Sequence, residues 1–153
     1  MSNLTKAVSA QWPIAVDFEA NFDDTMDNTS GVNLAIGAED AVDTTFAICT
    51  PPPGAVVVGG AVYTLAVFDS TANTLDLGDS DDPDRYTPTI HDLKSTTAHS
   101  VITPAGAVAK VYSGNQAIEA AILNTVTAST VGKFRIVILM SMSGKATENL
   151  KTT

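Results

Sequence analysis

The sequence predicts an all-β fold, an antiparallel β-sandwich of jelly-roll type with an extended N-terminal arm. Seven or eight short stretches are rich in the β-branched and aromatic residues that suit a pleated, half-buried surface. Clusters of Gly, Pro and Asp separate these stretches at short intervals, as turns between strands do. No long amphipathic helix and no repeat of fixed period is visible, which disfavours bundles, solenoids and propellers.

The length of 153 residues fits one domain, which we place at residues 12–143. Residues 1–11 are small and polar and are expected to form an N-terminal arm, and residues 144–153 a polar C-terminal tail. The first residues lack the apolar core of a signal peptide, and no apolar run is long enough to span a bilayer. We therefore expect a soluble protein.

The charge composition restricts the partners. The net charge is −9 with a pI near 4.3, and the eight Lys and Arg residues are scattered, so nucleic acid and anionic membranes are not expected as partners. Charged residues make up only 16% of the chain, which fits either a large interface or a Thr-rich β-surface. Cys49 is the single cysteine, so an intrachain disulfide is excluded and a small buried apolar role is expected.

In the first part of the chain, alternation predicts a strand from Trp12 to Phe18, with Pro13 confining it to an edge or a strand start. Residues 19–38 are predicted as a loop that contains a short strand near residues 32–36. Residues 41–49 form a clearer strand, with Thr44, Phe46 and Ile48 on one face, and three consecutive prolines end it.

The central stretch, residues 56–86, is predicted as a long hairpin with an acidic tip. Its first half is a strand with a bulge at Gly59-Gly60, and a short return strand surrounds Asp76. Residues 87–97 are predicted to be irregular, and residues 101–102 and 107–112 to be strands. Residues 116–126 fit both a helical and a strand period, and the all-β surroundings favour a strand. Residues 134–142 are nearly all apolar, as in a central strand covered on both faces.

The residues offer two candidate chemistries. Oxygen ligands in the acidic loop (Asp76, Asp79, Asp81, Asp82 and Asp84) suggest a calcium site, but the spacing does not match an EF-hand, and turn residues explain the loop better. Arg85 is expected to pair with one of these carboxylates. His91, Asp92 and a serine could form a hydrolytic triad, but no serine lies in a nucleophile-elbow motif. We therefore predict no enzyme, no cofactor and no metal.

The run G-G-A-V-Y-T-L-A-V-F-D-S-T-A-N-T-L-D-L-G-D-S-D-D-P-D-R-Y (residues 59–86) and the late strand G-K-F-R-I-V-I-L (residues 132–139) resemble small structural proteins of tailed bacteriophages. In particular the order of parts is similar to that of jelly-roll decoration, or cement, proteins of the capsid exterior. The resemblance implies a virion protein without catalytic residues. It implies a homodimer or homotrimer that binds the major capsid protein and holds neighbouring capsomers together.

On this reading, residues 1–18 contact the capsid or a neighbouring subunit through Leu4, Val8, Trp12 and Pro13, with Trp12 as the anchor; alternatively Trp12 fills the sandwich core. Two other functions remain open. A head-fibre or tail-associated sandwich would share the hairpin. A jelly-roll carbohydrate-binding module would bind glycans in a saturable way.

Overall fold

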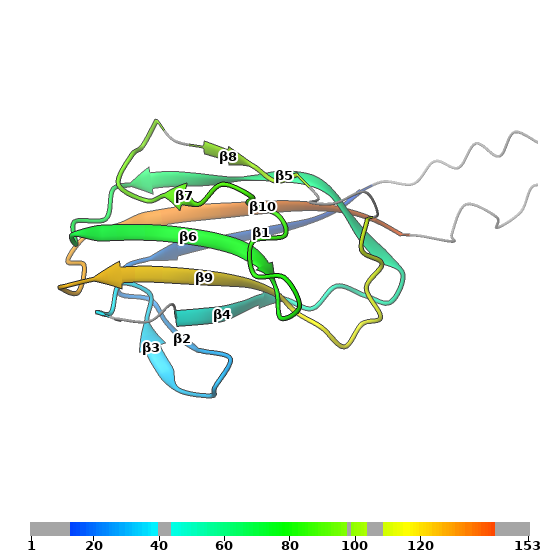
Figure 1. Cartoon of the computed structure of the whole chain (residues 1–153), viewed down its shortest axis with the longest axis horizontal. Helices are drawn as coiled ribbons and strands as arrows, with labels where there is room; N and C mark the ends of the chain where they lie inside the picture. The colour runs from blue at the N-terminus through cyan, green and yellow to red at the C-terminus, as the bar shows by residue number, and fades with distance from the viewer. Residues whose placement is uncertain (1–12, 40–43, 98, 104–108, 143–153) are drawn as a thin grey trace, which may run out of the picture.

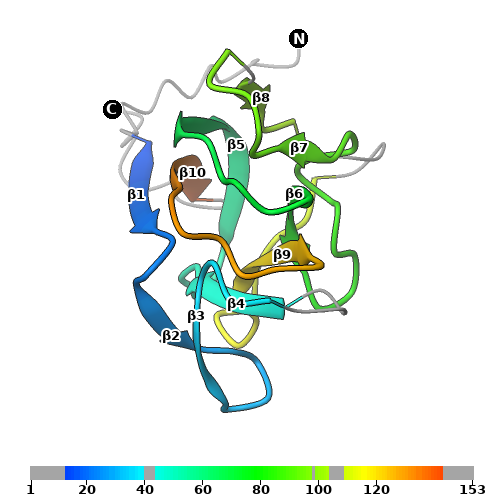
Figure 2. The ribbon, with the colours of Figure 1, turned by 90° about the vertical axis from the view of Figure 1, so that its left-hand side faces the viewer.

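The computed structural model describes residues 13–39, 44–97, 99–103 and 109–142. This part of the chain is all β, with two four-stranded antiparallel sheets packed as a sandwich and a separate two-stranded ribbon (Figures 1 and 2). No helix long and apolar enough to cross a bilayer occurs in these ranges. The predicted all-β antiparallel sandwich is confirmed.

The strands follow each other closely along the chain. The first sheet, which we call sheet A, has the order β1-β10-β5-β8, the second, sheet C, has the order β4-β9-β6-β7, and β2 and β3 form the ribbon. Their bounds are β1 Ile14–Asn21, β2 Thr25–Asp27, β3 Asn33–Ala35, β4 Thr44–Cys49, β5 Ala55–Ala66, β6 Ala72–Asp79, β7 His91–Asp92, β8 His99–Val101, β9 Ile118–Thr125 and β10 Lys133–Met142.

The pairing of the strands is that of a jelly roll. Leaving out the ribbon, the first strand pairs with the last, and successive pairs nest inward and alternate between the sheets: β1 with β10, β4 with β9, β5 with β8, and β6 with β7. A chain folded in half and rolled up gives this order, which is how the jelly roll limits its exposed edges.

The predicted hairpin over residues 56–86 is wrong. β5 lies in sheet A and β6 in sheet C, so the five residues between them cross from one sheet to the other. Phe68 fills this crossing: it is 1% exposed and its ring centroid lies 6.2 Å from that of Phe134 on β10. Alternation in the sequence specifies which face of a strand is buried, but it does not specify which strand lies beside it.

The predicted irregularity at Gly59-Gly60 is confirmed as a bulge. Met140 pairs with Val57 and Leu139 with Gly59, which leaves Val58 as the extra residue. Gly60 has φ +145°, and a Cβ there would lie 2.0 Å from the Val137 carbonyl oxygen. Only glycine allows β5 and β10 to approach this closely.

Most other strands were predicted near their observed positions. Strand β9 resolves the ambiguity at residues 116–126, and β10 is central between β1 and β5 as expected. The prediction that β10 is covered on both faces is wrong, because only its even-numbered residues are buried by the sandwich core. β1 is an edge strand, as Pro13 indicated, but it continues to Asn21 because that residue still pairs with Lys133.

Two loop predictions and one strand prediction need correction. The short strand predicted near residues 32–36 is β3, but residues 19–38 also contain β2, and residues 87–97 contain β7. Lys110–Tyr112 form no strand, and only Val111 makes an isolated bridge, to Val56. β2 and β7 have only three and two residues and depend on a partner already in place, so local composition gave little sign of them.

The predicted arm (1–11), the tail (144–153) and Leu4, Val8 and Trp12 lie outside the described residues. Pro13 is described and is exposed just before β1. The proposed division of the chain stays a prediction.

Candidate functional site

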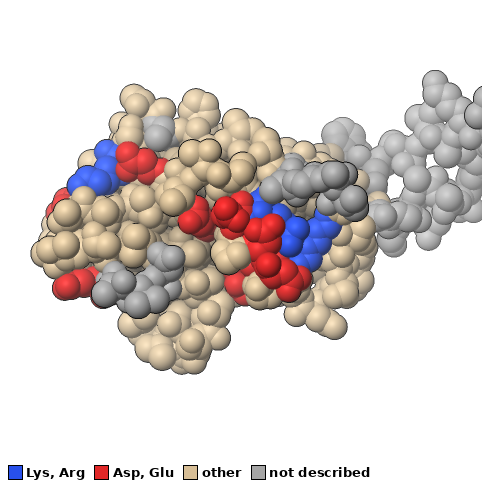
Figure 3. Space-filling model, viewed as in Figure 1, with Lys and Arg blue, Asp and Glu red and all other residues tan. Residues whose placement is uncertain are grey.

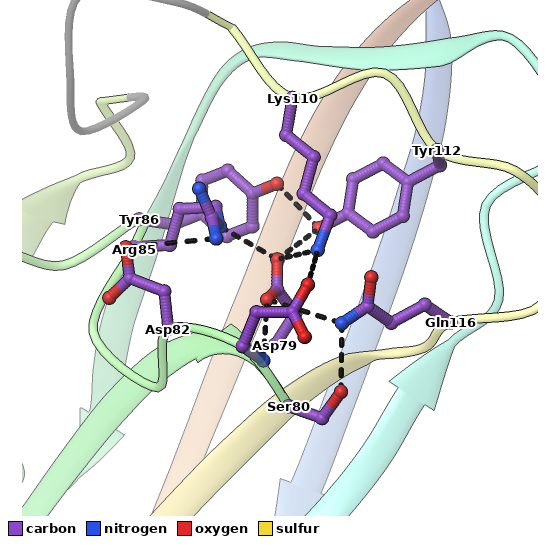
Figure 4. A network of polar contacts seen from close by, with 9 residues as sticks. Asp79, Ser80, Asp82, Arg85, Tyr86, Lys110, Tyr112 and Gln116 are labelled. Carbon is purple, nitrogen blue, oxygen red and sulfur yellow. Dashed lines mark hydrogen bonds and ion pairs between the residues drawn. The ribbon is translucent and has the colours of Figure 1, made fainter.

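The most developed polar site surrounds Asp79, the last residue of β6 (Figure 4). Its side chain is fully buried, and Oδ2 accepts hydrogen bonds from Arg85 Nε at 2.7 Å and Tyr112 OH at 3.1 Å. Lys110 Nζ lies 3.1 Å from the same oxygen. Oδ1 accepts from the Asp81 backbone amide at 3.0 Å and from Gln116 Nε2 at 3.4 Å. One carboxylate therefore joins β6, the loop after it and the segment before β9.

A second layer surrounds this core, and we call the whole set the Asp79 cluster. The Tyr86 and Tyr112 hydroxyls lie 2.5 Å apart, Lys110 also binds Asp81 at 2.9 Å, and Gln116 donates to Ser80 at 2.8 Å. Lys110 Nζ also lies 5.2 Å from the centroid of the Tyr112 ring, within cation–π range. Because the Tyr112 amide donates to the Ala55 carbonyl on β5, the cluster connects the two sheets.

The backbone conformation of the acidic loop positions the side chains of the Asp79 cluster. The amides and carbonyls of Asp79 and Asp82 bond each other reciprocally at 3.0 Å, which closes a tight turn. The turn passes directly over Gly78, where a Cβ would lie 2.2 Å from the Asp82 carbonyl oxygen. Gly78 therefore allows the loop to fold back and places Arg85 against Asp79.

Electrostatics keep Asp79 ionised. Burial opposes ionisation, but the bonds from Lys110, Arg85, the Asp81 amide and Tyr112 outweigh it and lower the pKa of Asp79. Burial and the tyrosine pairing raise the pKa of Tyr112, so it stays a neutral donor. The prediction that Arg85 pairs with an acidic-loop carboxylate is confirmed by Asp79 and, at 3.8 Å, by Asp82.

The calcium hypothesis finds no support in this geometry. The Asp79 side chain is fully buried and is neutralised by two cations, Arg85 and Lys110. Within the described ranges, no group of three or more His, Cys, Asp or Glu residues is arranged to hold a metal ion. In Figure 3 the acidic side chains gather over the end of β6, directly beside Lys and Arg side chains. This surface is an ion-pair network.

A shallow depression of about 200 Å³ lies next to the Asp79 cluster, between β9 and the acidic loop. Asp79 and Glu119 are its acidic residues, and burial raises the pKa of Glu119. A second depression, of about 250 Å³, is lined by Thr87, Pro88, Thr89, Ser100, Val101 and Thr103. Neither depression gathers an aromatic side chain of the kind a sugar ring stacks on.

A second buried cluster is centred on His91, on β7. The side chain is 1% exposed, with Nε2 2.9 Å from Thr64 Oγ1 on β5 and Nδ1 2.9 Å from Ser100 Oγ on β8. These three residues form what we call the His91 cluster, and it joins sheet C to sheet A. Burial is the main cause of the lowered pKa of His91.

The hypothetical Ser–His–Asp triad is not assembled. Asp92 points to the other face of β7, is exposed, and accepts a hydrogen bond from the Lys94 amide at 2.8 Å. Both nitrogens of His91 are already bonded to hydroxyls, so no carboxylate orients the ring. The arrangement fastens two sheets together.

Sequence reasoning identified Asp79, Arg85 and His91 but missed their partners Lys110, Tyr112, Gln116, Thr64 and Ser100. No local signal marks these partners.

Cys49 is only partly buried, and burial raises the pKa of its thiol to about 11, so it is an unreactive thiol that packs against the core.

Comparisons with known proteins show which solved structures share this fold. No protein-family model and no curated protein matches the sequence. Among solved structures, a chain of the "Cyanophage Pam1 capsid asymmetric unit" matches with a TM-score of 0.54 and 18% identity, covering 93% of this chain and 97% of that one. A chain of the "Acidic stable capsid structure of Helicobacter pylori bacteriophage KHP30" matches with a TM-score of 0.48 and 14% identity, covering 86% and 94%. At 18% identity the first match establishes a shared fold along nearly the whole of both chains.

Proposed function

We propose that this protein is a structural component of a bacteriophage virion that decorates the capsid exterior. The observation that carries the proposal is the match over nearly the full length of both chains to a chain of a capsid asymmetric unit. Because 93% of one chain covers 97% of the other, the two proteins are of similar size. A small all-β chain of this size fits an accessory shell protein that binds to a lattice built by a larger one.

The polar clusters support a structural role. The Asp79 and His91 clusters both connect the two sheets, and the side chains within each cluster are hydrogen-bonded to one another. A domain fastened at two points is stiff, and stiffness reduces the entropy lost when it binds a surface. A protein that holds capsomers together gains from such rigidity.

In the proposed mechanism, the protein acts as a homodimer or homotrimer that bridges neighbouring major-capsid subunits. Residues 1–18 make the contact, with residues 1–11 as an arm that orders on binding and with Leu4, Val8, Trp12 and Pro13 as contact residues. Each contact is modest, and simultaneous binding by several arms of one oligomer supplies avidity.

The test is reconstitution with undecorated capsids of the phage that encodes this chain, followed by cryo-EM. We expect stoichiometric density at symmetry-related sites on the outside of the shell. Density at a single vertex would contradict the proposal and favour a fibre- or tail-associated role. Shells that stay bare, together with saturable glycan binding by the free protein, would favour a carbohydrate-binding module.

Deleting residues 1–11 tests the arm separately. We expect the truncated protein to fold and to lose capsid occupancy by at least tenfold, because each lost contact is multiplied across the oligomer. The matched control is deletion of residues 144–153, which removes a polar tail of similar length and is expected to leave occupancy unchanged. Undiminished occupancy after deletion of residues 1–11 would remove the arm from the mechanism.

A further inference from the structure

The outward face of sheet A does not have the composition of a solvent-facing sheet. In an antiparallel sheet with one buried face, the other face is normally polar. Here the outward residues of β5 include Val58, Tyr63 and Leu65, exposed by 51%, 40% and 47%, and β8 adds Val101 at 59%. The outward face of β5 carries no charged residue, and on β10 Val137 and Leu139 lie between the charged Lys133 and Arg135 and the strand end.

Strand register places Ala61, Tyr63 and Val101 on one continuous surface, and Val58 and Leu65 are the extra residues at two register shifts of β5 against β10. Val101 pairs with Ala61, Ala61 with Val137 of β10, and Val137 with Asp17 of β1. Leu139 and Gly59 form the neighbouring row, next to the bulge at Val58. We call this surface the sheet A outer face. None of the described segments packs over it (Figure 2).

The charges on the sheet A outer face cancel. Asp17 pairs with Arg135, and Glu19 pairs with Lys133 at 2.5 Å, all four on β1 and β10. The net charge of −9 therefore belongs to the rest of the molecule. Two copies that met through the acidic surface at the end of β6 would repel each other, whereas two copies that met through the sheet A outer face would not.

We propose that the sheet A outer face is the surface through which one copy of this chain docks on a second copy, face to face. Two antiparallel sheets with Val, Leu and Tyr side chains between them pack about 10 Å apart and bury both faces, as in the interior of a sandwich. The inference deepens the proposed function, since it names the self-contact of the decorating oligomer.

The size of the surface fits this occupant. β1, β5, β8 and β10 contain 33 residues in all, which at about 3.4 Å per residue and about 4.8 Å between strands give a face on the order of 540 Å² in projection. A standard interface takes about 800 Å² of accessible surface from each partner, so this face supplies most of one partner's share.

Pairing through the free edge of β1 is a poorer solution. Two antiparallel copies of β1 would bring Asp17 and Glu19 of one copy near the same residues of the other, and like charges across a strand pair are destabilising. The apolar side chains of the sheet A outer face would also stay exposed.

The test is sedimentation equilibrium of the full-length protein, its Val101→Asp and Leu65→Asp variants, and the control Val32→Asp. Val32 is exposed by 52% in the turn between β2 and β3, off the sheet A outer face, so it matches the chemistry and exposure of the change. We expect the unaltered protein to self-associate in the micromolar range, each face variant to weaken association by at least tenfold, and the control to stay within about twofold. Circular dichroism establishes that each variant is folded, and if Val101→Asp does not fold, Leu65→Asp carries the test.

Three outcomes overturn the inference: a monomer at concentrations up to about 1 mM, face variants that behave like the control, or a protein that associates only after residues 1–11 are deleted. The last outcome would mean that the chain's own N-terminal segment covers the face. Capsid occupancy measured in parallel separates the two proposals. A monomer that fills capsid sites overturns only the self-contact, and an oligomer that leaves capsids bare overturns only the proposed function.

Discussion

The Asp79 cluster and the His91 cluster perform the same structural task with different chemistry. Each links sheet C to sheet A, and each centres on one buried titratable side chain. Asp79 is charged and satisfied by two cations and neutral donors, whereas His91 is held by two hydroxyls. An ionic centre is costly to break, because a lost partner leaves buried charge behind, and a neutral centre costs only its hydrogen bonds.

The largest expected effect is at Asp79. Asp79→Asn keeps the shape but leaves Arg85 and Lys110 facing a neutral amide, so we expect a loss of about 3–5 kcal/mol in the free energy of unfolding. Urea denaturation measures it. Asp81→Asn is the control, because Asp81 is 66% exposed and binds the same Lys110. Equal effects at Asp79 and Asp81 would mean that burial of the ion pair is not what makes this cluster strong.

Gly78→Ala tests the backbone support of the Asp79 cluster alone. The new Cβ would lie 2.2 Å from the Asp82 carbonyl oxygen, so the acidic loop must shift and carry Arg85 away from Asp79. We expect the free energy of unfolding to fall by about 3 kcal/mol. Gly59→Ala is the control, since no atom lies within 4 Å of its added Cβ. Hydrogen exchange should show opening confined to the acidic loop, and unchanged protection there would contradict the assignment.

His91→Phe breaks the second cluster and is expected to cost about 1–3 kcal/mol, because Thr64 and Ser100 lose their partner. Thr64 is 4% exposed but keeps its longer hydrogen bond to the Asp92 carbonyl oxygen at 3.4 Å, which limits the loss. The exposed His99 on β8 provides the control His99→Phe. If His91→Phe lowered the free energy of unfolding in urea as much as Asp79→Asn or more, the contrast between ionic and neutral centres would be wrong.

The smallest effect is a difference in pH dependence. The pKa of His91 is lowered from 6.5, so its contribution is complete above pH 6.5 and declines as the pH falls below it, by at most about 1.4 kcal/mol per pH unit. The pKa of Asp79 is lowered from 3.8, so its contribution is lost only as the pH falls below 3.8. Burial raises the pKa of Glu119 from 4.5, so the ionised Glu119 lowers the stability of the fold above pH 4.5. This loss becomes smaller as the pH falls.

The difference between the unfolding curves of the unaltered protein and His91→Phe, measured between pH 7 and pH 5, isolates the contribution of His91. As the pH falls across this range, we expect the free energy of unfolding of the unaltered protein to decrease relative to that of His91→Phe. Parallel curves for the two proteins would show that His91 does not titrate differently in the folded and unfolded states.

The sequence predicted the local features of this fold well. Alternating apolar residues located β4 and β9 and their inward faces, because a strand side chain points to one face or the other with a period of two. A nearly continuous apolar run located β10 but not its inward face. Pro13 marked an edge strand, and Gly59-Gly60 marked a bulge, because each restricts or frees the backbone at its own position.

The sequence by itself determined the fold class, the approximate strands and the presence of an acidic turn closed by Arg85. Only the tertiary structure decided that β5 and β6 part into different sheets, and that Asp79 finds Tyr112 and Gln116, 33 and 37 residues further along the chain. Face and turn preferences are properties of neighbouring residues, whereas strand pairing and buried contacts depend on how the whole chain closes on itself. For the same reason, the apolar outer face of sheet A became visible only once the sheet was assembled.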